Sequence, residues 1–241
     1  MLMKNFLLSA KKIFLDILFP KFCLNCEREG NYLCQDCFYL IDILDRQYCP
    51  FCFPPKITLD GKTCESCKRT KKLKGLFCAA SYENFIVKKT INRFKYRPYL
   101  KDLAPVLASL IITYLIKLNK LSDFGDFSLV PIPLHKRKLK LRGYNQAEEL
   151  AKEISTILKI PVLSNVLLKI KNTPAQVELK KEERRENIKN AFLCKDPAMI
   201  KNKKILLVDD VFTTGATMEE CALVLRNSGA KEVWGMVVAR G

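Results

Sequence analysis

The sequence predicts an α/β protein with a parallel sheet, preceded by a small cysteine-rich domain. Three observations support this fold class. From residue 76 onward, short apolar runs alternate with helical patterns, which is typical of parallel strands joined by crossover helices. Eight of the 11 cysteines fall in four CxxC pairs before residue 70. One apolar run ends in two acids and a threonine-rich loop, within residues 203–217.

Residues 1–20 are expected to form an N-terminal amphipathic helix that ends at Pro20. Its apolar positions recur at helical spacing over residues 2–19, while Lys4, Lys11 and Lys12 lie toward the other side. Packing against the rest of the protein is the favoured interpretation, and peripheral membrane contact is the alternative. No apolar run has the length of a signal sequence or of a membrane span. We therefore expect a cytoplasmic protein, with the inner face of the cytoplasmic membrane as the alternative location.

Residues 21–70 are predicted to form a double zinc ribbon. A CxxC turn places two thiolates on one side of a tight knuckle, and two knuckles complete a tetrahedral shell. Eight ligands thus predict two structural Zn²⁺ ions. Sequential pairing of the knuckles is the simplest arrangement, interleaved pairing stays open, and iron–sulfur or redox chemistry is the rival interpretation. The eight candidate ligands are Cys23, Cys26, Cys34, Cys37, Cys49, Cys52, Cys64 and Cys67.

A basic linker over residues 68–74 leads into the predicted α/β domain, residues 75–241. Strands are expected over residues 75–82, 128–133, 205–208 and 233–239. Helices are expected over residues 83–96, 103–118, 145–158 and 217–227. The remaining cysteines, Cys78, Cys194 and Cys221, sit in apolar patterns and are expected to be buried.

The segment KKILLVDDVFTTGAT (203–217) is the strongest functional signal. Its order places Asp209 and Asp210 at the carboxyl end of a strand, where open α/β sheets bind ligands. Backbone N–H groups and hydroxyls of Thr213 to Thr217 can surround a phosphate at the start of a helix. Neither GxxxxGK[ST] nor GxGxxG occurs, which argues against the common nucleotide-binding loops.

This segment resembles the loop by which type I phosphoribosyltransferases bind 5-phosphoribosyl-1-pyrophosphate (PRPP). The resemblance implies that Asp209 and Asp210 hold the ribose 2′- and 3′-hydroxyls and that Thr213 to Thr217 hold the 5′-phosphate. It also implies Mg²⁺ bound together with PRPP. The PRPP-binding residues would be Asp209, Asp210, Val211, Phe212, Thr213, Thr214, Gly215, Ala216 and Thr217.

Two further segments, VPIPLHKRKLKLRGYNQAEELA (130–151) and TPAQVELKKEERRENIKNAF (173–192), together with the CxxC pairs, resemble the ComF family. The resemblance covers nearly the whole chain. It implies a type I phosphoribosyltransferase-like domain behind a double zinc ribbon, and a role in bacterial DNA uptake. It also implies a pyrophosphate-binding loop after the strand at Val130, with Arg137, Lys138 and Arg142 as candidates. No residue is assigned a catalytic role, and residues 169–190 are expected to form a hood over the site.

The net charge of +17, from 42 Lys and Arg against 25 Asp and Glu, favours polyanionic partners, although a generally basic proteome explains the same excess. Basic and aromatic residues alternate in INRFKYRPY (91–99), a pattern that suits single-stranded DNA. We expect a PRPP-binding protein that handles single-stranded DNA during uptake, with a helicase or membrane channel as further partners. The alternative is an active phosphoribosyltransferase that modifies a base or an amine.

Overall fold

The structure is a computed structural model that describes residues 20–173 and 186–241. The chain divides into two compact units, Met1–Asp42 and Ile43–Gly241. The predicted helix over residues 2–19 and most of the predicted hood lie outside the described residues. None of the described helices is long and apolar enough to cross a bilayer.

The described part of the first unit is a small cysteine-rich fold. Its one regular helix, α2 (Gln35–Tyr39), begins directly after Cys34. A single bridge joins Phe22 to Glu29, and Glu27 between them has a positive φ of 62°. Because this unit has so little regular structure, metal binding by its four cysteines is the main candidate for holding its chain segments together.

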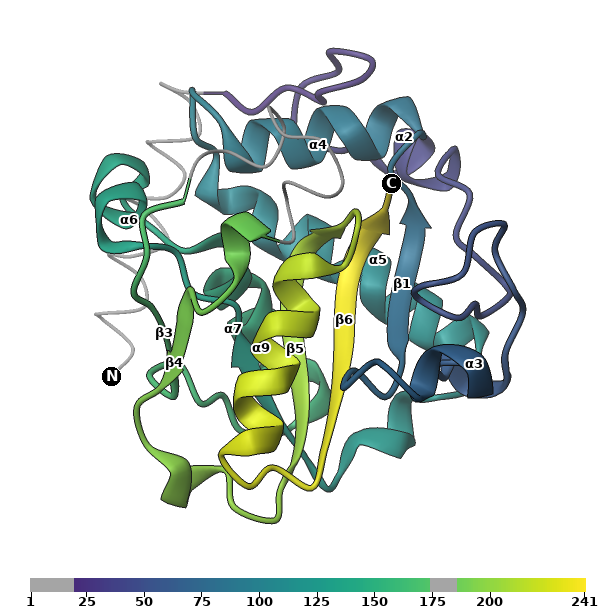
Figure 1. The fold of residues 1–241 in the computed structure, drawn as a ribbon. Helices are drawn as coiled ribbons and strands as arrows, with labels where there is room; N and C mark the ends of the chain where they lie inside the picture. Colours follow the sequence, from purple (N-terminus) through teal and green to yellow (C-terminus); the bar gives the residue numbers. More distant parts are fainter. Residues whose placement is uncertain (1–19, 174–185) are drawn as a thin grey trace, which may run out of the picture. The chain divides into compact units, whose positions relative to one another are not determined.

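The second unit opens with a cysteine-rich segment that contains the short helices η1 (Leu59–Gly61) and α3 (Glu65–Lys68). A parallel sheet follows, in the order β1-β6-β5-β2, of which Figure 1 labels β1, β6 and β5. Its strands are β1 (Leu76–Ser81), β2 (Phe127–Pro131), β5 (Lys204–Phe212) and β6 (Glu232–Arg240). Residues 233–239 of β6 are all buried, as expected for a central parallel strand covered on both faces.

Helices cover both faces of this sheet (Figure 1). Helices α5 (Ala104–Lys117) and α7 (Gln146–Leu158) pack on one face, with α4 (Phe85–Lys95) and the turn η2 (Lys101–Leu103) against α5. Helix α9 (Ala216–Asn227) covers the other face, next to a hairpin of β3 (Leu167–Lys169) and β4 (Phe192–Cys194). The short turns η3 (Leu121–Phe124) and η5 (Pro197–Met199) precede β2 and β5.

The predicted fold class is confirmed, and each predicted strand and helix of the α/β part is present within a few residues. Strand β5 is longer than expected, because Asp209 and Val211 continue the pairing with β6. The expected basic loop after β2 is wrong: residues 136–142 form helix α6 (Lys136–Arg142). His135 caps this helix by accepting the Arg137 N–H at 3.3 Å, and Gly143 ends it at a φ of +85°.

Two of the three unpaired cysteines are buried as predicted. Cys78 on β1 and Cys221 on α9 both lie in the core. Cys194 is only half-buried, because it ends the edge strand β4.

Candidate ligand site and metal centres

A cavity of about 680 Å³ lies at the carboxyl edge of the sheet. A second cavity of about 310 Å³ adjoins it, and the two share Lys95, Tyr96, Asp209 and Thr217. Residues at the end of β1, in α4, at the end of β5 and at the start of α9 line the larger cavity. Residues after β2, in α6, in α7 and in the hairpin line the smaller one. The sheet thus places its hollow where parallel sheets bind ligands.

The adjacent acids Asp209 and Asp210 point to opposite faces of the sheet, because both lie within β5 and side chains alternate along a strand. Asp210 faces α4, where its Oδ1 accepts a hydrogen bond from Lys95 Nζ at 2.9 Å. Asp209 faces α9, and its charge acts on the thiol of Cys221 in that helix. The resemblance predicts that both acids hold ribose, whereas the structure brings only Asp209 to the cavity walls.

Asp210 is 1% exposed. Its second oxygen, Oδ2, has no hydrogen-bond partner among the described residues. The ammonium group of Lys95 donates to Oδ1 and offsets part of the cost of burying the charged Asp210 carboxylate. Asp210 therefore anchors Lys95 at the common wall of the two cavities.

Asp209 is half-buried, and its Oδ1 accepts the N–H of Asp210 at 2.9 Å. Burial, and then the negative charge of Asp210, raises the pKa of Asp209 to about 7, while Lys95 opposes that shift. A carboxyl group with this pKa gains or loses its proton near neutral pH. Its other oxygen, Oδ2, can accept hydrogen bonds from hydroxyl groups of a ligand.

The threonine-rich loop forms the start of α9. Gly215 is the N-cap and has a φ of +75°, a conformation that favours glycine. Thr214 Oγ1 accepts the Ala216 N–H at 3.4 Å, and Thr213 is exposed. This twelve-residue helix directs its N-terminal dipole toward the larger cavity, which Thr213, Gly215, Ala216 and Thr217 help to line.

The predicted pyrophosphate-side residues divide into two groups. Lys138 and Arg142 of α6 line the smaller cavity, while Arg137 is exposed on the same helix and does not. The structure adds Lys169 at the end of β3, which sequence reasoning placed in the hood without a role. Burial, and then the charge of Lys138, lowers the pKa of Lys169 to about 8. Three cationic side chains therefore gather on one cavity wall.

Two buried polar atoms near this wall have no hydrogen-bond partner among the described residues: Arg142 Nη1 and Gln146 Oε1. The Arg142 guanidinium lies 5.9 Å from the centre of the Tyr99 ring. Unpaired buried donors and acceptors are costly unless a ligand or water completes them. Asn145, in contrast, has a structural role, because it caps α7 and donates to Ile132 O.

The basic–aromatic segment 91–99 is mainly a packing element. Ile91 and Phe94 are 0% exposed, and the Phe94 ring lies 5.6 Å from that of Tyr144. Tyr96 is 45% exposed and lines both cavities. The segment therefore contributes to the cavities, and it does not present an open row of stacking residues.

The cysteines form two four-sulfur clusters in sequence order, which resolves the pairing that the spacing left open. Within each cluster all four Sγ atoms lie within 4.8 Å of one another. The clusters are Cys23, Cys26, Cys34 and Cys37, and Cys49, Cys52, Cys64 and Cys67. Zn–S bonds of about 2.3 Å in a tetrahedron require S···S separations of about 3.8 Å. Each cluster could therefore hold one zinc ion.

Hydrogen bonds orient the sulfur atoms in both clusters. The Cys34 N–H donates to Cys23 Sγ, and the Cys64 N–H donates to Cys49 Sγ, each at 3.4 Å. Contact with the Ser66 hydroxyl, followed by the backbone at Cys67, lowers the pKa of Cys64 to about 6. Such hydrogen bonds favour the thiolate, the form that binds metal.

Comparison with known proteins agrees with this geometry. A family model described as "Phosphoribosyl transferase domain" matches residues 143–241. "Competence protein F" of Haemophilus influenzae is 41% identical over 118 residues, which cover 46% of this chain and 50% of the relative. "Competence protein ComFC" of Streptococcus pneumoniae is 27% identical over 216 residues, 85% of this chain and 86% of the relative. These matches confirm the predicted resemblance to the ComF family.

A further relative is "DNA utilization protein YhgH" of Escherichia coli K12, which is 36% identical over 44% of this chain and 47% of the relative. The matches to the Haemophilus and Escherichia proteins span about half of the length of those relatives. The predicted resemblance and the phosphoribosyltransferase-type fold are thereby confirmed.

Proposed function

We propose that this ComF-like protein takes part in DNA uptake and binds PRPP at the carboxyl edge of its sheet. The observation that carries the proposal is the cavity of about 680 Å³ with Asp209 on one wall and the N-terminus of α9 on another. This volume is within the roughly 300–1,000 Å³ of small-molecule sites. A hydroxyl acceptor beside a phosphate loop suits a ligand that carries both a 5′-phosphate and ribose hydroxyls, as PRPP does.

The proposed binding mode follows from the walls. The 5′-phosphate lies in the loop Thr213–Thr217, where backbone N–H groups and the helix dipole favour an anion. Asp209, once ionised, accepts hydrogen bonds from the ribose hydroxyls. Asp210 supports this arrangement through Lys95, at the common wall of the two cavities.

The diphosphate would extend into the smaller cavity, toward Lys138, Arg142 and Lys169. The positive charges of these side chains, and the Arg142 Nη1 that has no hydrogen-bond partner among the described residues, suit a group of high negative charge. Mg²⁺ would enter with the diphosphate and neutralise part of that charge, held mainly by ligand oxygens and water. Of the predicted candidates, Lys138 and Arg142 keep this role in the proposal, and Arg137 is exposed outside the cavity.

Isothermal titration calorimetry with PRPP and Mg²⁺ tests the binding site. Asp209→Asn should weaken PRPP binding at least tenfold, because an amide cannot replace a charged acceptor for two hydroxyls. Asp126→Asn is the matched control, since its side chain is 82% exposed and lies near the opposite edge of the sheet. Wild-type protein that binds no PRPP would refute the proposal.

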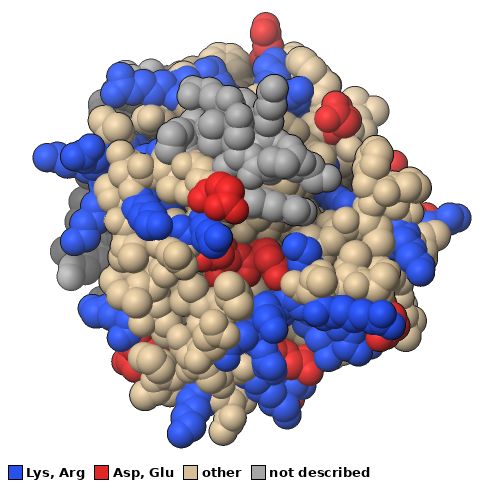
Figure 2. All heavy atoms as spheres, in the orientation of Figure 1, with Lys and Arg blue, Asp and Glu red and all other residues tan. Residues whose placement is uncertain are grey.

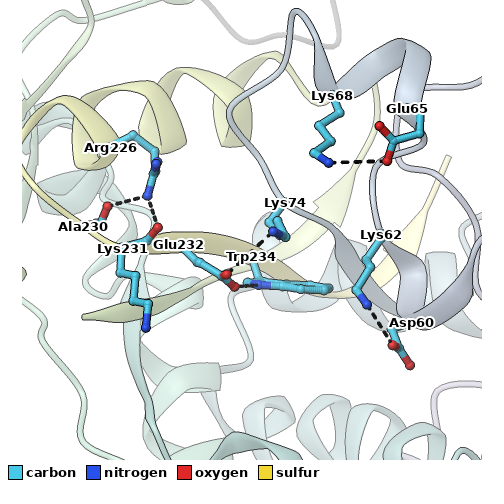
Figure 3. Close-up of polar contacts among 10 residues, drawn as sticks. All are labelled: Asp60, Lys62, Glu65, Lys68, Lys74, Arg226, Ala230, Lys231, Glu232 and Trp234. Atoms are coloured by element: carbon cyan, nitrogen blue, oxygen red, sulfur yellow. Dashed lines mark hydrogen bonds and ion pairs between the residues drawn. The ribbon is translucent and has the colours of Figure 1, made fainter. Parts of the chain in front are cut away.

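The proposal includes single-stranded DNA as a partner, in keeping with the names of the relatives. Lys and Arg side chains gather near α3 on the face that carries α9 (Figure 2). Figure 3 labels five basic residues of this region, Lys62, Lys68, Lys74, Arg226 and Lys231, together with their polar contacts. Ion pairs with Asp60, Glu65 and Glu232 neutralise only part of their charge.

Fluorescence anisotropy with a labelled oligothymidylate, measured against salt, tests this part of the proposal. Binding should weaken with salt at a slope that reflects the phosphates contacted. Lys68→Ala with Lys231→Ala should make that slope shallower. Lys152→Ala on α7 is the control, because this lysine is 52% exposed and lies in a different element. A wild-type slope near zero would remove DNA from the proposal.

The second candidate function is phosphoribosyl transfer to a base or an amine. The smaller cavity favours it, because Tyr99, Ile132 and Phe192 give an apolar wall near Asp209, where an acceptor could lie. Transfer would break the bond between C1′ and pyrophosphate, which leaves with the electron pair, and form a bond from C1′ to the acceptor nitrogen, whose N–H proton passes to water. Pyrophosphate release with a panel of bases distinguishes turnover from binding alone.

The cellular setting is likewise proposed from the relatives. We place the protein in the cytoplasm, where it would receive incoming DNA from a helicase or a membrane channel. Contact of residues 2–19 with the inner face of the membrane belongs to the same proposal, and these residues lie outside the described part. Fractionation of cells that express the wild type and a variant without residues 2–19 would locate the protein.

A further inference from the structure

The second cysteine cluster contacts the phosphate loop through a residue that lies between two of its ligands. Phe51 is part of the knuckle Cys49-Pro-Phe-Cys52. Its ring packs edge-on against that of Phe212, with centroids 6.1 Å apart and an interplanar angle of 61°. Phe212 is the last residue of β5 and is 2% exposed. The metal knuckle therefore lies against the strand end from which the loop departs.

The same two rings pack against Gly215, the N-cap of α9. A Cβ added to Gly215 would lie 2.4 Å from Phe212 Cζ and 3.1 Å from Phe51 Cε1. Atoms of the loop and the knuckle are thus in direct contact, without room for a methyl group between them. A shift of Phe51 would change the packing of the residue whose φ of +75° sets the direction of the loop.

Arg240 forms a second link between the knuckle and the strand ends. Its Nη1 donates to Cys49 O at 3.2 Å and its Nη2 to Cys52 O at 3.3 Å. In the sheet, Arg240 is the register partner of Phe212. Arg240 therefore binds the carbonyl groups of both ligands in this turn, Cys49 and Cys52. It also lies beside the strand that carries the phosphate loop.

Glu219, in the first turn of α9, forms a third link. Its carboxylate accepts the N–H groups of Lys72 at 2.8 Å and of Leu73 at 3.2 Å, a few residues after the last ligand, Cys67. Lys71 Nζ lies 5.0 Å from the centre of the Phe51 ring. The start of α9 thus contacts the first CxxC turn of the second cluster through Phe51 and the chain after its last ligand through Glu219.

We propose that the second cluster positions the phosphate loop, with Phe51 as the positioning residue, so that metal at Cys49, Cys52, Cys64 and Cys67 and phosphoribosyl binding at residues 213–217 strengthen each other. This inference rests on the proposed PRPP site. Metal ligation fixes the Cys49–Cys52 turn, and the turn fixes the ring under Gly215. A loop that is already ordered loses less conformational entropy when a phosphate binds. The coupling is reciprocal, so bound ligand also retains the metal.

The proposal is tested with Phe51→Ala against Phe53→Ala. The two phenylalanines are separated by a single ligand, but Phe53 is 91% exposed and Phe51 packs on the loop. Hydrogen exchange of amides 213–218 should accelerate in Phe51→Ala and stay at the wild-type rate in Phe53→Ala. Exchange in the central strand β6 serves as the check on overall folding. PRPP affinity should fall about 5- to 150-fold in Phe51→Ala, the range typical of coupled sites.

A second measurement needs no variant. Zinc transfer from the wild-type protein to a chromophoric chelator is followed with and without saturating PRPP and Mg²⁺. PRPP should slow release of one of the two zinc ions at least fivefold and leave the other unchanged.

The outcomes separate the two proposals. Calorimetry that shows no PRPP binding by the wild type would refute the proposed function, and the ligand-linked part of this inference with it. PRPP binding that is equal in both variants, with zinc release indifferent to PRPP, would overturn the inference and leave the proposed function intact. Equal hydrogen exchange at residues 213–218 in both variants would overturn the positioning role of Phe51, whether or not PRPP binds.

Discussion

Lys95 of α4 donates a hydrogen bond of 2.9 Å to Asp210 of β5, although 115 positions separate the two residues. The lysine is 29% exposed and the aspartate 1%. One member of the pair is therefore wholly removed from water, while the other reaches the cavity wall. The pair fixes α4 to the strand end that forms the site.

Lys95→Met should destabilise the protein by about 1–3 kcal/mol, because it leaves the buried Asp210 carboxylate without its partner. Urea unfolding measures this change. Lys88→Met is the control, since Lys88 lies on the same helix and lines the same cavity but contacts the Tyr82 ring. Adding Asp210→Asn to Lys95→Met should recover much of the loss. A loss equal to that of Lys88→Met would show that the pair contributes nothing.

Asp209 should make the protein less stable as pH rises from about 4 to 7. Burial and Asp210 raise its pKa to about 7 in the folded state, above the ordinary value of about 3.9. The folded protein then binds the proton more tightly, so this stabilising contribution is complete below the ordinary pKa and is lost as pH rises through the raised one.

Asp209→Asn removes this titration. Urea unfolding between pH 5 and 8 should show the variant gaining stability relative to the wild type as pH rises. Asp126→Asn, at a carboxylate that is 82% exposed, should track the wild type. Parallel curves for wild type and Asp209→Asn would contradict the raised pKa.

Lys169→Gln should weaken PRPP binding more than ribose-5-phosphate binding, because Lys169 lines the cavity assigned to the diphosphate. Its pKa of about 8 implies that wild-type affinity for PRPP declines as pH rises above 8, where the free protein loses this charge. Calorimetry at pH 7 and 9 should show the decline in the wild type and less of it in Lys169→Gln. Lys171→Gln is the control, at an exposed residue two positions later. Equal losses for both ligands would place the diphosphate elsewhere.

Gly215→Ala should disrupt the loop through both its positive φ and its contact with Phe212. Two other glycines separate these effects. Gly143 has a φ of +85° with nothing within 4 Å of an added Cβ, and Gly125 has both open space and a helical conformation. Chemical denaturation should rank the loss of stability Gly215→Ala > Gly143→Ala > Gly125→Ala. A loss of stability at Gly215 no larger than at Gly143 would show that the Phe212 and Phe51 rings can move to accommodate the added methyl group.

Two zinc ions per chain are expected by elemental analysis of the purified protein. Cys26→Ser and Cys52→Ser should each lower the content by about one, because each leaves one complete cluster of four thiolates. Cys78→Ser should leave it unchanged, since Cys78 is buried in β1 outside both clusters. Iron in place of zinc, or a content far below two, would contradict the assignment.

The sequence allowed the strands, the helices and both clusters to be predicted, because each depends on a local pattern. Apolar runs such as 205–208 define strands, and CxxC spacing defines knuckles. The end of β5 was harder to predict from the sequence, because only pairing with β6 shows that the strand continues past Asp210 to Phe212. That continuation is what places the two acids on opposite faces.

Contacts between distant segments could not be predicted. Nothing near Lys95 in the sequence indicates that its partner is Asp210, and Lys169 reaches the cavity only because β3 pairs with β4. Helix α6 was missed because its run of basic residues looks like a solvated loop, and its cap is an unusual one, His135. Phe51 gave no signal at all, since its importance comes from the fold around it.

The two cavities share one wall, so together they form a binding site with two halves. The shared wall consists of Lys95, Tyr96, Asp209 and Thr217. A molecule with an anionic group at each end can be held by both halves at once, and joining the ends makes the second attachment intramolecular. Such a molecule should outbind either fragment by orders of magnitude, while the separate fragments, a pentose phosphate and inorganic pyrophosphate, should occupy the site together without competing.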